Sequence, residues 1–149
     1  MTDINDQRPV TIVMVEDDEG HARLIERNIR RAGISNVIRH FPDGTSALEY
    51  LFTGVDGPML NGPALILLDL NLPDMSGIDI LAKIKSEAKL KRTPVVVLTT
   101  TDDKVEIQRC YDLGCNVYIT KPVNYESFAD AIRQLGLFLS VIQVPEVAE

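Results

Sequence analysis

The sequence of 149 residues has no tryptophan, only two cysteines and no long apolar run. A helix that crosses a bilayer needs roughly 20 mainly apolar residues, and no stretch approaches that length. Residues 1–10 (MTDINDQRPV) also lack the apolar centre of a secretory signal peptide. We therefore expect a cytoplasmic protein that does not enter a membrane.

Cysteine is too sparse to form a framework of disulfides. Cys110 and Cys115 lie five positions apart, which is not the spacing of a Cys-x-x-Cys redox motif. We expect two free thiols, buried or half-buried, with no redox role.

The chain also has few basic residues. Its 15 Lys and Arg residues are outnumbered by 22 Asp and Glu residues, which gives a net charge of -7. Binding to nucleic acid requires a basic patch, so nucleic acid is not the expected main partner. An acidic surface suits a basic partner or a metal cation. The apolar content of 45% fits an ordinary soluble domain, large enough to bury a core without disulfides or a structural metal.

Short apolar runs alternate with segments of helical periodicity along the chain. We expect strands at residues 10–15, 37–41, 64–69, 95–99 and 117–120, and helices at 19–32, 46–52, 78–89, 103–113 and 125–142. Asp18 and Asn124 are candidate N-caps, and Ser46 with Glu49 forms a candidate capping box. This alternation predicts an α/β fold, a parallel sheet of five strands with helices on both faces.

The organising stretch is 64–77, ALILLDLNLPDMSG. Its continuous apolar run is typical of a strand buried on both faces of a parallel sheet. The strand ends in Asp69, at the edge where open α/β sheets bind ligands. Taken alone, this stretch fits a carboxylate that caps a turn as well as one that carries chemistry.

Other polar residues follow the remaining strands, and parallel strands bring their carboxyl ends to one edge. These residues are Glu16, Asp17 and Asp18 after the first strand, Thr99, Thr100 and Thr101 at the fourth, and Thr120, Lys121 and Pro122 at the fifth. Clustered carboxylates repel one another unless a cation lies among them. A site of carboxylates without nearby Cys or His favours Mg²⁺ over zinc. With a Lys and a Thr beside it, such a site suits phosphoryl transfer, with Asp69 as nucleophile.

These motifs resemble the receiver domain of bacterial two-component response regulators, over about residues 10–139. The resemblance implies the CheY-like, flavodoxin-like fold with strand order 2-1-3-4-5, and a phosphoacceptor signalling protein, not an enzyme. It implies that Asp69 is the phosphoacceptor. The implied Mg²⁺ ligands are Asp17, Asp69, the backbone carbonyl of Asn71 and, mainly through water, Glu16.

The resemblance also implies a conformational switch. Thr99 and Thr100 are implied to bind the phosphoryl group, Thr99 as the hydroxyl that moves towards it. Tyr118 matches the aromatic position that follows this movement, and Lys121 matches the family's lysine. The Lys121-Pro122 bond is expected to be cis. Asn71 and Thr101 match positions that tune the lifetime of the phosphorylated state.

The resemblance further implies how the chain is organised and what it pairs with. No output domain follows the last helix, so we expect a stand-alone receiver: an arm at 1–9, the domain at 10–142 and a tail at 143–149. The DLNLP loop, LKRTPVVVLTTT and the Gly/Pro-rich loop 54–63 look most like regulators of bacterial phytochrome histidine kinases. The expected partner is therefore a sensor histidine kinase, with a phosphate sink or a relay intermediate as alternatives.

The end of the last predicted helix is apolar on more than one face. Its core-facing stripe is Phe128, Ile132, Leu135, Leu139 and Ile142. Further apolar residues lie off that stripe, and we expect a homodimer through Leu135, Leu137, Phe138, Val141 and Ile142 and the tail. The alternative is that the tail folds back over its own domain.

Two other functions share part of this pattern. A phosphatase of the haloacid dehalogenase type needs Asp-x-Asp after its first strand, whereas here Asn71 takes the second position and the motif closes the third strand. A nucleotide-binding module needs a Gly-rich or hydroxyl-rich loop after the first strand, where this chain has three acids.

Overall fold

The computed structural model describes residues 10–52, 63–100, 103–121 and 124–134. Five strands form one parallel sheet in the order β2-β1-β3-β4-β5. Their bounds are β1 Thr11–Val15, β2 Ile38–Phe41, β3 Ala64–Asp69, β4 Val95–Thr99 and β5 Val117–Thr120. The predicted fold class and strand order are confirmed.

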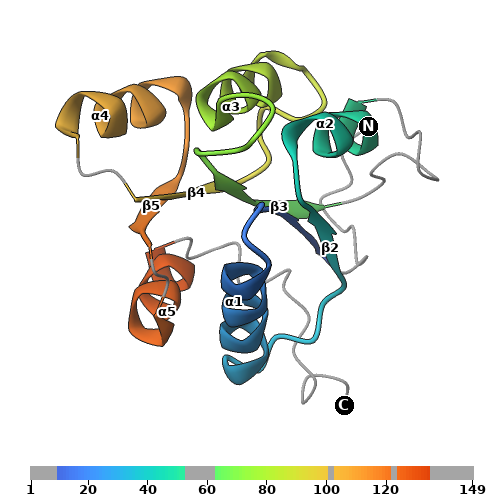
Figure 1. Ribbon diagram of the computed structural model, residues 1–149, viewed down its shortest axis with the longest axis vertical. Helices are drawn as coiled ribbons and strands as arrows, with labels where there is room; N and C mark the ends of the chain where they lie inside the picture. Colours follow the sequence, from blue (N-terminus) through green and yellow to red (C-terminus); the bar gives the residue numbers. More distant parts are fainter. Residues whose placement is uncertain (1–9, 53–62, 101–102, 122–123, 135–149) are drawn as a thin grey trace.

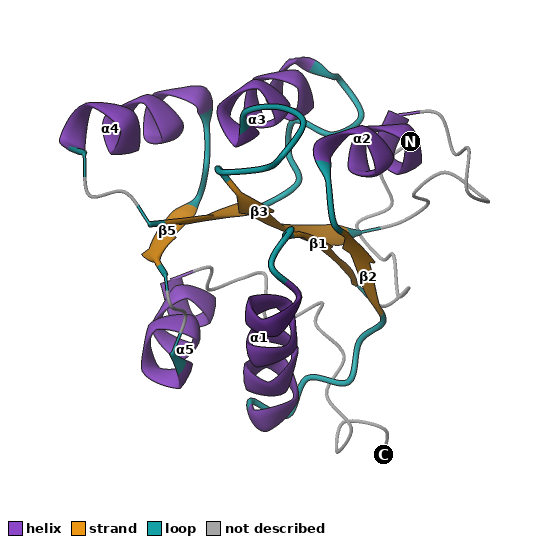
Figure 2. Ribbon diagram, in the orientation of Figure 1, coloured by secondary structure: helices purple, strands orange, loops and turns teal. Residues whose placement is uncertain are grey.

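Five helices cover the two faces of the sheet. Helices α1 (Glu19–Arg31) and α5 (Tyr125–Gln134) lie on one face, and α2 (Gly44–Phe52), α3 (Gly77–Ser86) and α4 (Lys104–Leu113) lie on the other (Figures 1 and 2). The sheet therefore separates two apolar cores, one beneath α1 and α5 and the other beneath α2, α3 and α4.

The central strand is buried over its whole length, as its continuous apolar run predicts. Every residue of β3 is buried, and β1 and β4 flank it. The more polar β2 lies at the edge of the sheet, with Arg39 and His40 exposed. Burial of the middle strands thus places the acid at the end of β3 in the centre of the sheet edge.

Two predicted N-caps are confirmed and one is wrong. Asp18 accepts a hydrogen bond from the His21 backbone N–H at 3.0 Å, and Asn124 accepts one from Ser127 N–H at 2.8 Å. Helix α2, however, begins at Gly44, where Asp43 accepts from the Ser46 backbone N–H at 2.8 Å. Asp43 is the cap because its short carboxylate reaches the third N–H of the helix, so Ser46 lies inside α2.

Both cysteines are free and buried, as predicted. Burial raises the pKa of the Cys115 thiol to about 12, and repulsion from Cys110 adds to this effect. A thiol that stays protonated is a poor nucleophile, so these residues contribute to packing.

Part of the predicted C-terminal region lies outside the described residues. The structure describes α5 as far as Gln134, and Phe128 is buried in the core beneath it, 2% exposed. The dimer residues Leu135, Leu137, Phe138, Val141 and Ile142 lie beyond this range. Among the described helices, none has the length and apolar character to cross a bilayer.

Gly77 joins β3 to α3 at a point with no room for a side chain. A Cβ at this position would lie 2.6 Å from Leu70 Cα and closer still to the carbonyl oxygen of Asp69. We expect Gly77→Ala to lower the free energy of unfolding by about 1–3 kcal/mol, because backbone atoms must shift. Urea denaturation measures this change.

The matched control for Gly77→Ala is Gly20→Ala in α1. There the nearest atom to an added Cβ is Asp18 Oδ1 at 3.4 Å, an ordinary contact. Alanine has the higher helix propensity, so stability should be unchanged or slightly greater. Equal losses in both variants would contradict the close packing at Gly77.

Candidate functional site

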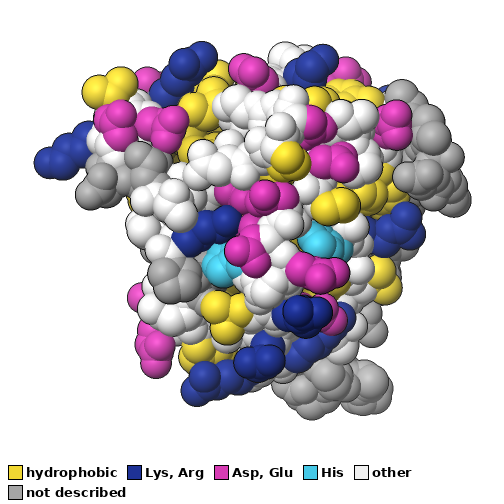
Figure 3. Space-filling model, viewed as in Figure 1, with side chains coloured by type: hydrophobic (Ala, Val, Ile, Leu, Met, Phe, Trp, Pro, Cys, Tyr) yellow, Lys and Arg dark blue, Asp and Glu magenta, His cyan; other side chains and the backbone are white. Residues whose placement is uncertain are grey.

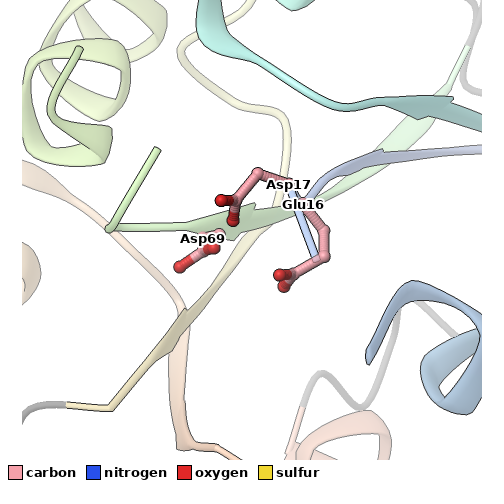
Figure 4. Close-up of side chains that lie close together, drawn as sticks. All are labelled: Glu16, Asp17 and Asp69. Atoms are coloured by element: carbon pink, nitrogen blue, oxygen red, sulfur yellow. The ribbon is translucent and has the colours of Figure 1, made fainter. Parts of the chain in front are cut away.

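The carboxyl ends of β1, β3, β4 and β5 meet at one edge of the sheet. Glu16 and Asp17 follow β1, and Asp69 is the last residue of β3. Thr99 is the last residue of β4, and Lys121 follows β5. One carboxylate oxygen each from Glu16, Asp17 and Asp69 lies within 4.8 Å of the others. Figure 4 shows the carboxylates of Asp17 and Asp69 close together, with that of Glu16 extending away from them. The predicted acidic cluster is thus present.

The pKa values of both aspartates in the cluster are raised, although Asp17 is exposed. Asp69 is fully buried, and burial raises its pKa, with a further contribution from the charge of Glu16. The pKa of Asp17 is also raised, by partial burial and by the hydrogen bond and charge of Asp69. Both shifts mean that negative charge here is incompletely compensated by the protein, which is the condition that favours a bound cation.

Lys121 supplies the cationic side chain of the site. Its Nζ lies 2.9 Å from Glu16 Oε2 and 3.1 Å from Asp69 Oδ2. Although burial alone would lower its pKa, hydrogen bonds to Glu16 and Asp69 outweigh that effect and raise it. The backbone fixes its position, because Lys121 N–H donates to the Thr99 carbonyl at 2.8 Å. The ammonium therefore stays charged between the two buried acids.

Two histidines also bind Glu16, which the sequence did not predict. His21 Nδ1 lies 3.1 Å from Glu16 Oε1, and His40 Nε2 lies 2.7 Å from the Glu16 carbonyl oxygen. Figure 3 shows the two histidines of the chain on either side of a group of acidic side chains. The prediction that no histidine lies near the acids was wrong. The signal was available, since His21 is in the first turn of the helix that follows Glu16.

The remaining predicted residues lie on or just after β3, β4 and β5. Asn71 N–H donates to Asp69 Oδ1 at 3.0 Å, and its side-chain amide donates to Thr100 Oγ1 at 3.4 Å. Thr99 is fully buried, and Tyr118 is half-buried on β5. Thr101 and Pro122 lie outside the described residues, and with them the predicted cis bond.

Asp74 lies in the loop between β3 and α3 and binds this loop to the start of helix α2. Its carboxylate accepts hydrogen bonds from the backbone N–H groups of Gly44 at 2.9 Å and Thr45 at 2.8 Å, and from the Thr45 hydroxyl. These bonds lower the pKa of Asp74 from 3.8 to about 2, and the bond from the Thr45 hydroxyl has the largest effect. The loop between β3 and α3 is thus held against the start of α2.

This anchor predicts a pH-dependent contribution to stability. Because the folded-state pKa of Asp74 is about 2 and its ordinary value is 3.8, the contribution is fully present above pH 3.8 and is lost as the pH falls through about 2. We expect Asp74→Ala to be less stable than the native chain near neutral pH. The difference should narrow as the solution is acidified from about pH 5 to pH 3.

Urea denaturation of both proteins at each pH measures this difference. Glu26→Ala, an exposed position on α1, is the control and should show no such trend. A difference that stays constant with pH would contradict the anchor.

The donor set fits a divalent cation. One oxygen from each of three carboxylates lies within 4.8 Å of the others, and oxygen ligands of this kind suit Mg²⁺, Mn²⁺ and Ca²⁺. Lys121 offsets part of the negative charge, yet the pKa values of Asp17 and Asp69 remain raised. The cluster could therefore hold a divalent metal ion.

The sequence and fold of this chain are similar to those of known proteins. Residues 12–133 match the response regulator receiver domain. Response regulator Rcp1 of Synechocystis sp. is 34% identical over 138 residues, covering 92% of this chain and 94% of that protein. The crystal structure of the Mn²⁺-bound form of Rcp1 is 35% identical with a TM-score of 0.72, and covers 92% of this chain and 99% of that chain.

Two further solved structures show the same similarity. A response regulator receiver domain from Rhodospirillum rubrum is 69% identical with a TM-score of 0.74, covering 91% of this chain and 96% of that chain. The bacteriophytochrome response regulator RtBRR is 35% identical with a TM-score of 0.76, covering 87% of this chain and 79% of that chain. With its fold, its acidic cluster and these matches, the chain belongs to the response regulator receiver domain family.

Proposed function

We propose that the chain accepts a phosphoryl group on Asp69 from the phosphohistidine of a sensor kinase. A carboxylate oxygen of Asp69 forms the bond to phosphorus while the phosphorus–nitrogen bond breaks, and the imidazole leaves with the bonding electrons. The environment of Asp69 is the main support for this proposal. Its buried carboxylate lies at the centre of the sheet edge, with Lys121 Nζ at 3.1 Å and two more acids beside it.

We assign the metal-binding role to Asp17, Asp69, the carbonyl of Asn71 and, through water, Glu16, with Mg²⁺ as the physiological ion. When bound, the ion neutralises charge on the phosphoryl oxygens. Lys121, which follows β5, offsets charge on another oxygen. Asn71 N–H, which donates to Asp69 Oδ1 at 3.0 Å, orients the nucleophile.

The phosphorylated state is proposed to bias a conformational switch. The Thr99 and Thr100 hydroxyls would bind the phosphoryl group, and Tyr118 would follow their movement. Tyr118 lies near Tyr111 of α4, where Val105 is 78% exposed and Tyr111 is 44% exposed. Exposed apolar side chains here support the face formed by α4, β5 and α5 as the surface that signals to a target.

Phosphorylation by acetyl phosphate tests the proposed function. The full chain should gain the mass of one phosphoryl group when Mg²⁺ is present, and peptide mapping after borohydride reduction should place it at Asp69. Little or no product should form in excess EDTA. Product that forms equally well in EDTA, or at another residue, would contradict the proposal.

We propose a bacteriophytochrome histidine kinase as the partner. The similarity to RtBRR and the loop sequences around β3 and β4 support this assignment. A phosphorylated bacteriophytochrome kinase should transfer its label to this chain faster than an unrelated kinase does. Equal rates would contradict the assignment. Loss of label from the kinase without a downstream acceptor would favour the phosphate-sink alternative.

We also propose a cytoplasmic homodimer that acts through binding and has no substrate of its own. The apolar residues at 135–142 support the dimer, because a helix that covers a sheet needs only one apolar face. Sedimentation velocity should give a dimer for the full chain and a monomer for a version that ends near residue 135. Two monomers would contradict the proposed interface.

A further inference from the structure

The carboxylate of Glu16 is completely enclosed and has several hydrogen-bond donors around it. Glu16 is 0% exposed, and its Oε2 accepts from Lys121 Nζ at 2.9 Å and from Asp18 N–H at 3.1 Å. Its other oxygen, Oε1, lies 3.1 Å from His21 Nδ1. Since a carboxylate only accepts, we assign the proton of this bond to His21 Nδ1.

His21 is well placed to hold Glu16 on the α1 side of the acidic cluster. It lies in the first turn of α1, and its own N–H is fixed by the cap residue Asp18 at 3.0 Å. Its side chain is only 10% exposed, so water competes little for the bond. In Figure 4 the carboxylate of Glu16 extends away from those of Asp17 and Asp69.

We propose that His21 is a positioning residue that competes with the divalent cation for Glu16. This inference rests on the proposed cation site. Part of the negative charge of Glu16 is compensated by the imidazole N–H, and that part is not available to attract a cation. Removing the donor leaves a buried carboxylate oxygen without its partner, and a cation with its hydration shell is the alternative source of compensation.

The competition links the cation to the first turn of α1. A cation that draws Glu16 towards Asp17 and Asp69 weakens the bond to His21. By reciprocity, whatever strengthens the His21–Glu16 bond weakens cation binding by the same factor. Lys121 and Asp18 contact the other oxygen, so the effect is specific to the oxygen that faces α1.

The test is the Mg²⁺ affinity of three full-length variants, measured by isothermal titration calorimetry. His21→Phe keeps a ring without a donor, and should bind Mg²⁺ about tenfold more tightly, the equivalent of one hydrogen bond. His21→Asn keeps an N–H near the position of Nδ1 and should bind like the native chain. His40→Phe removes a donor to the Glu16 backbone carbonyl only, and should change the affinity much less.

Metal-free stability and histidine NMR give readouts that do not depend on phosphorylation. His21→Phe should unfold at a lower temperature without metal and regain more stability than the native chain when Mg²⁺ is added. With only two histidines in the chain, the ring signals of His21 should shift with Mg²⁺ more than those of His40.

The outcomes separate the two proposals. A native chain that binds no Mg²⁺ would overturn the cation site itself. A native chain that binds Mg²⁺, with His21→Phe binding equally or more weakly, would overturn the competition and leave His21 with a structural role. If His21→Phe does not fold, Mg²⁺ titration of the native chain followed by histidine NMR decides, and His21→Asn identifies the His21 signal by its loss. A His21 signal that does not shift with Mg²⁺ contradicts the proposal.

Discussion

Asp69→Asn is expected to abolish phosphorylation by acetyl phosphate, the largest effect that the site predicts. An amide has no anionic oxygen to attack phosphorus, whereas the other members of the cluster are unchanged. The substitution is nearly isosteric and removes a buried charge that repels Glu16 and Asp17. The fold should therefore persist, with a melting temperature in the absence of metal at least equal to that of the native chain.

The control for Asp69→Asn is Asp79→Asn, an exposed acid in the first turn of α3. It should be phosphorylated like the native chain when both are followed by intact-protein mass measurement. Because the chain has no tryptophan, mass or gel mobility is a better readout than intrinsic fluorescence. Label retained in Asp69→Asn would show that the acceptor has been assigned to the wrong residue.

Lys121→Met is expected to make the stability of the protein depend strongly on divalent metal. The native ammonium lies about equally close to Glu16 and Asp69, at 2.9 Å and 3.1 Å, and both carboxylates are fully buried. Removing one partner of a buried ion pair costs about 3 kcal/mol, because the remaining carboxylates lose their cationic partner. Mg²⁺ should restore more stability to the variant than to the native chain. Phosphorylation should slow by about 10²–10³, the cost of losing one electrostatic donor to the transferring group.

Lys85 provides a matched control. It is also half-buried, but its ammonium donates to the carbonyl oxygens of Lys91 at 3.1 Å and Thr93 at 2.8 Å, away from the acids. Lys85→Met should lose stability that Mg²⁺ does not restore, and should be phosphorylated normally. A Lys121→Met variant that responds to Mg²⁺ no more than Lys85→Met would contradict the role given to Lys121.

The sequence predicts the architecture well because the strands carry strong, unambiguous patterns. The fully apolar runs of β3 and β4 require burial on both faces, and the more polar β2 fits an edge. Once the strands are parallel, their carboxyl ends share one edge. The convergence of Asp17, Asp69 and Lys121 then follows from connectivity, without knowledge of any side-chain conformation.

The details that the sequence missed depend on which side chain reaches a given N–H group or carboxylate. The predicted cap of α2 was Ser46, whereas the backbone path brings the Ser46 N–H to the Asp43 carboxylate. The role of Asp74 depends on α2 lying beside the β3–α3 loop, a contact between segments about thirty positions apart. The bonds from His21 and His40 depend likewise on how Glu16 is oriented after β1.

The central claim is that acids from separate strands gather around one divalent ion, and crystals of the full chain grown with Mn²⁺ test it most directly. Anomalous scattering should locate a single ion bound to Asp17, Asp69 and the carbonyl of Asn71. Mn²⁺ found elsewhere, with Asp17 and Asp69 making no contact to it, would contradict the account.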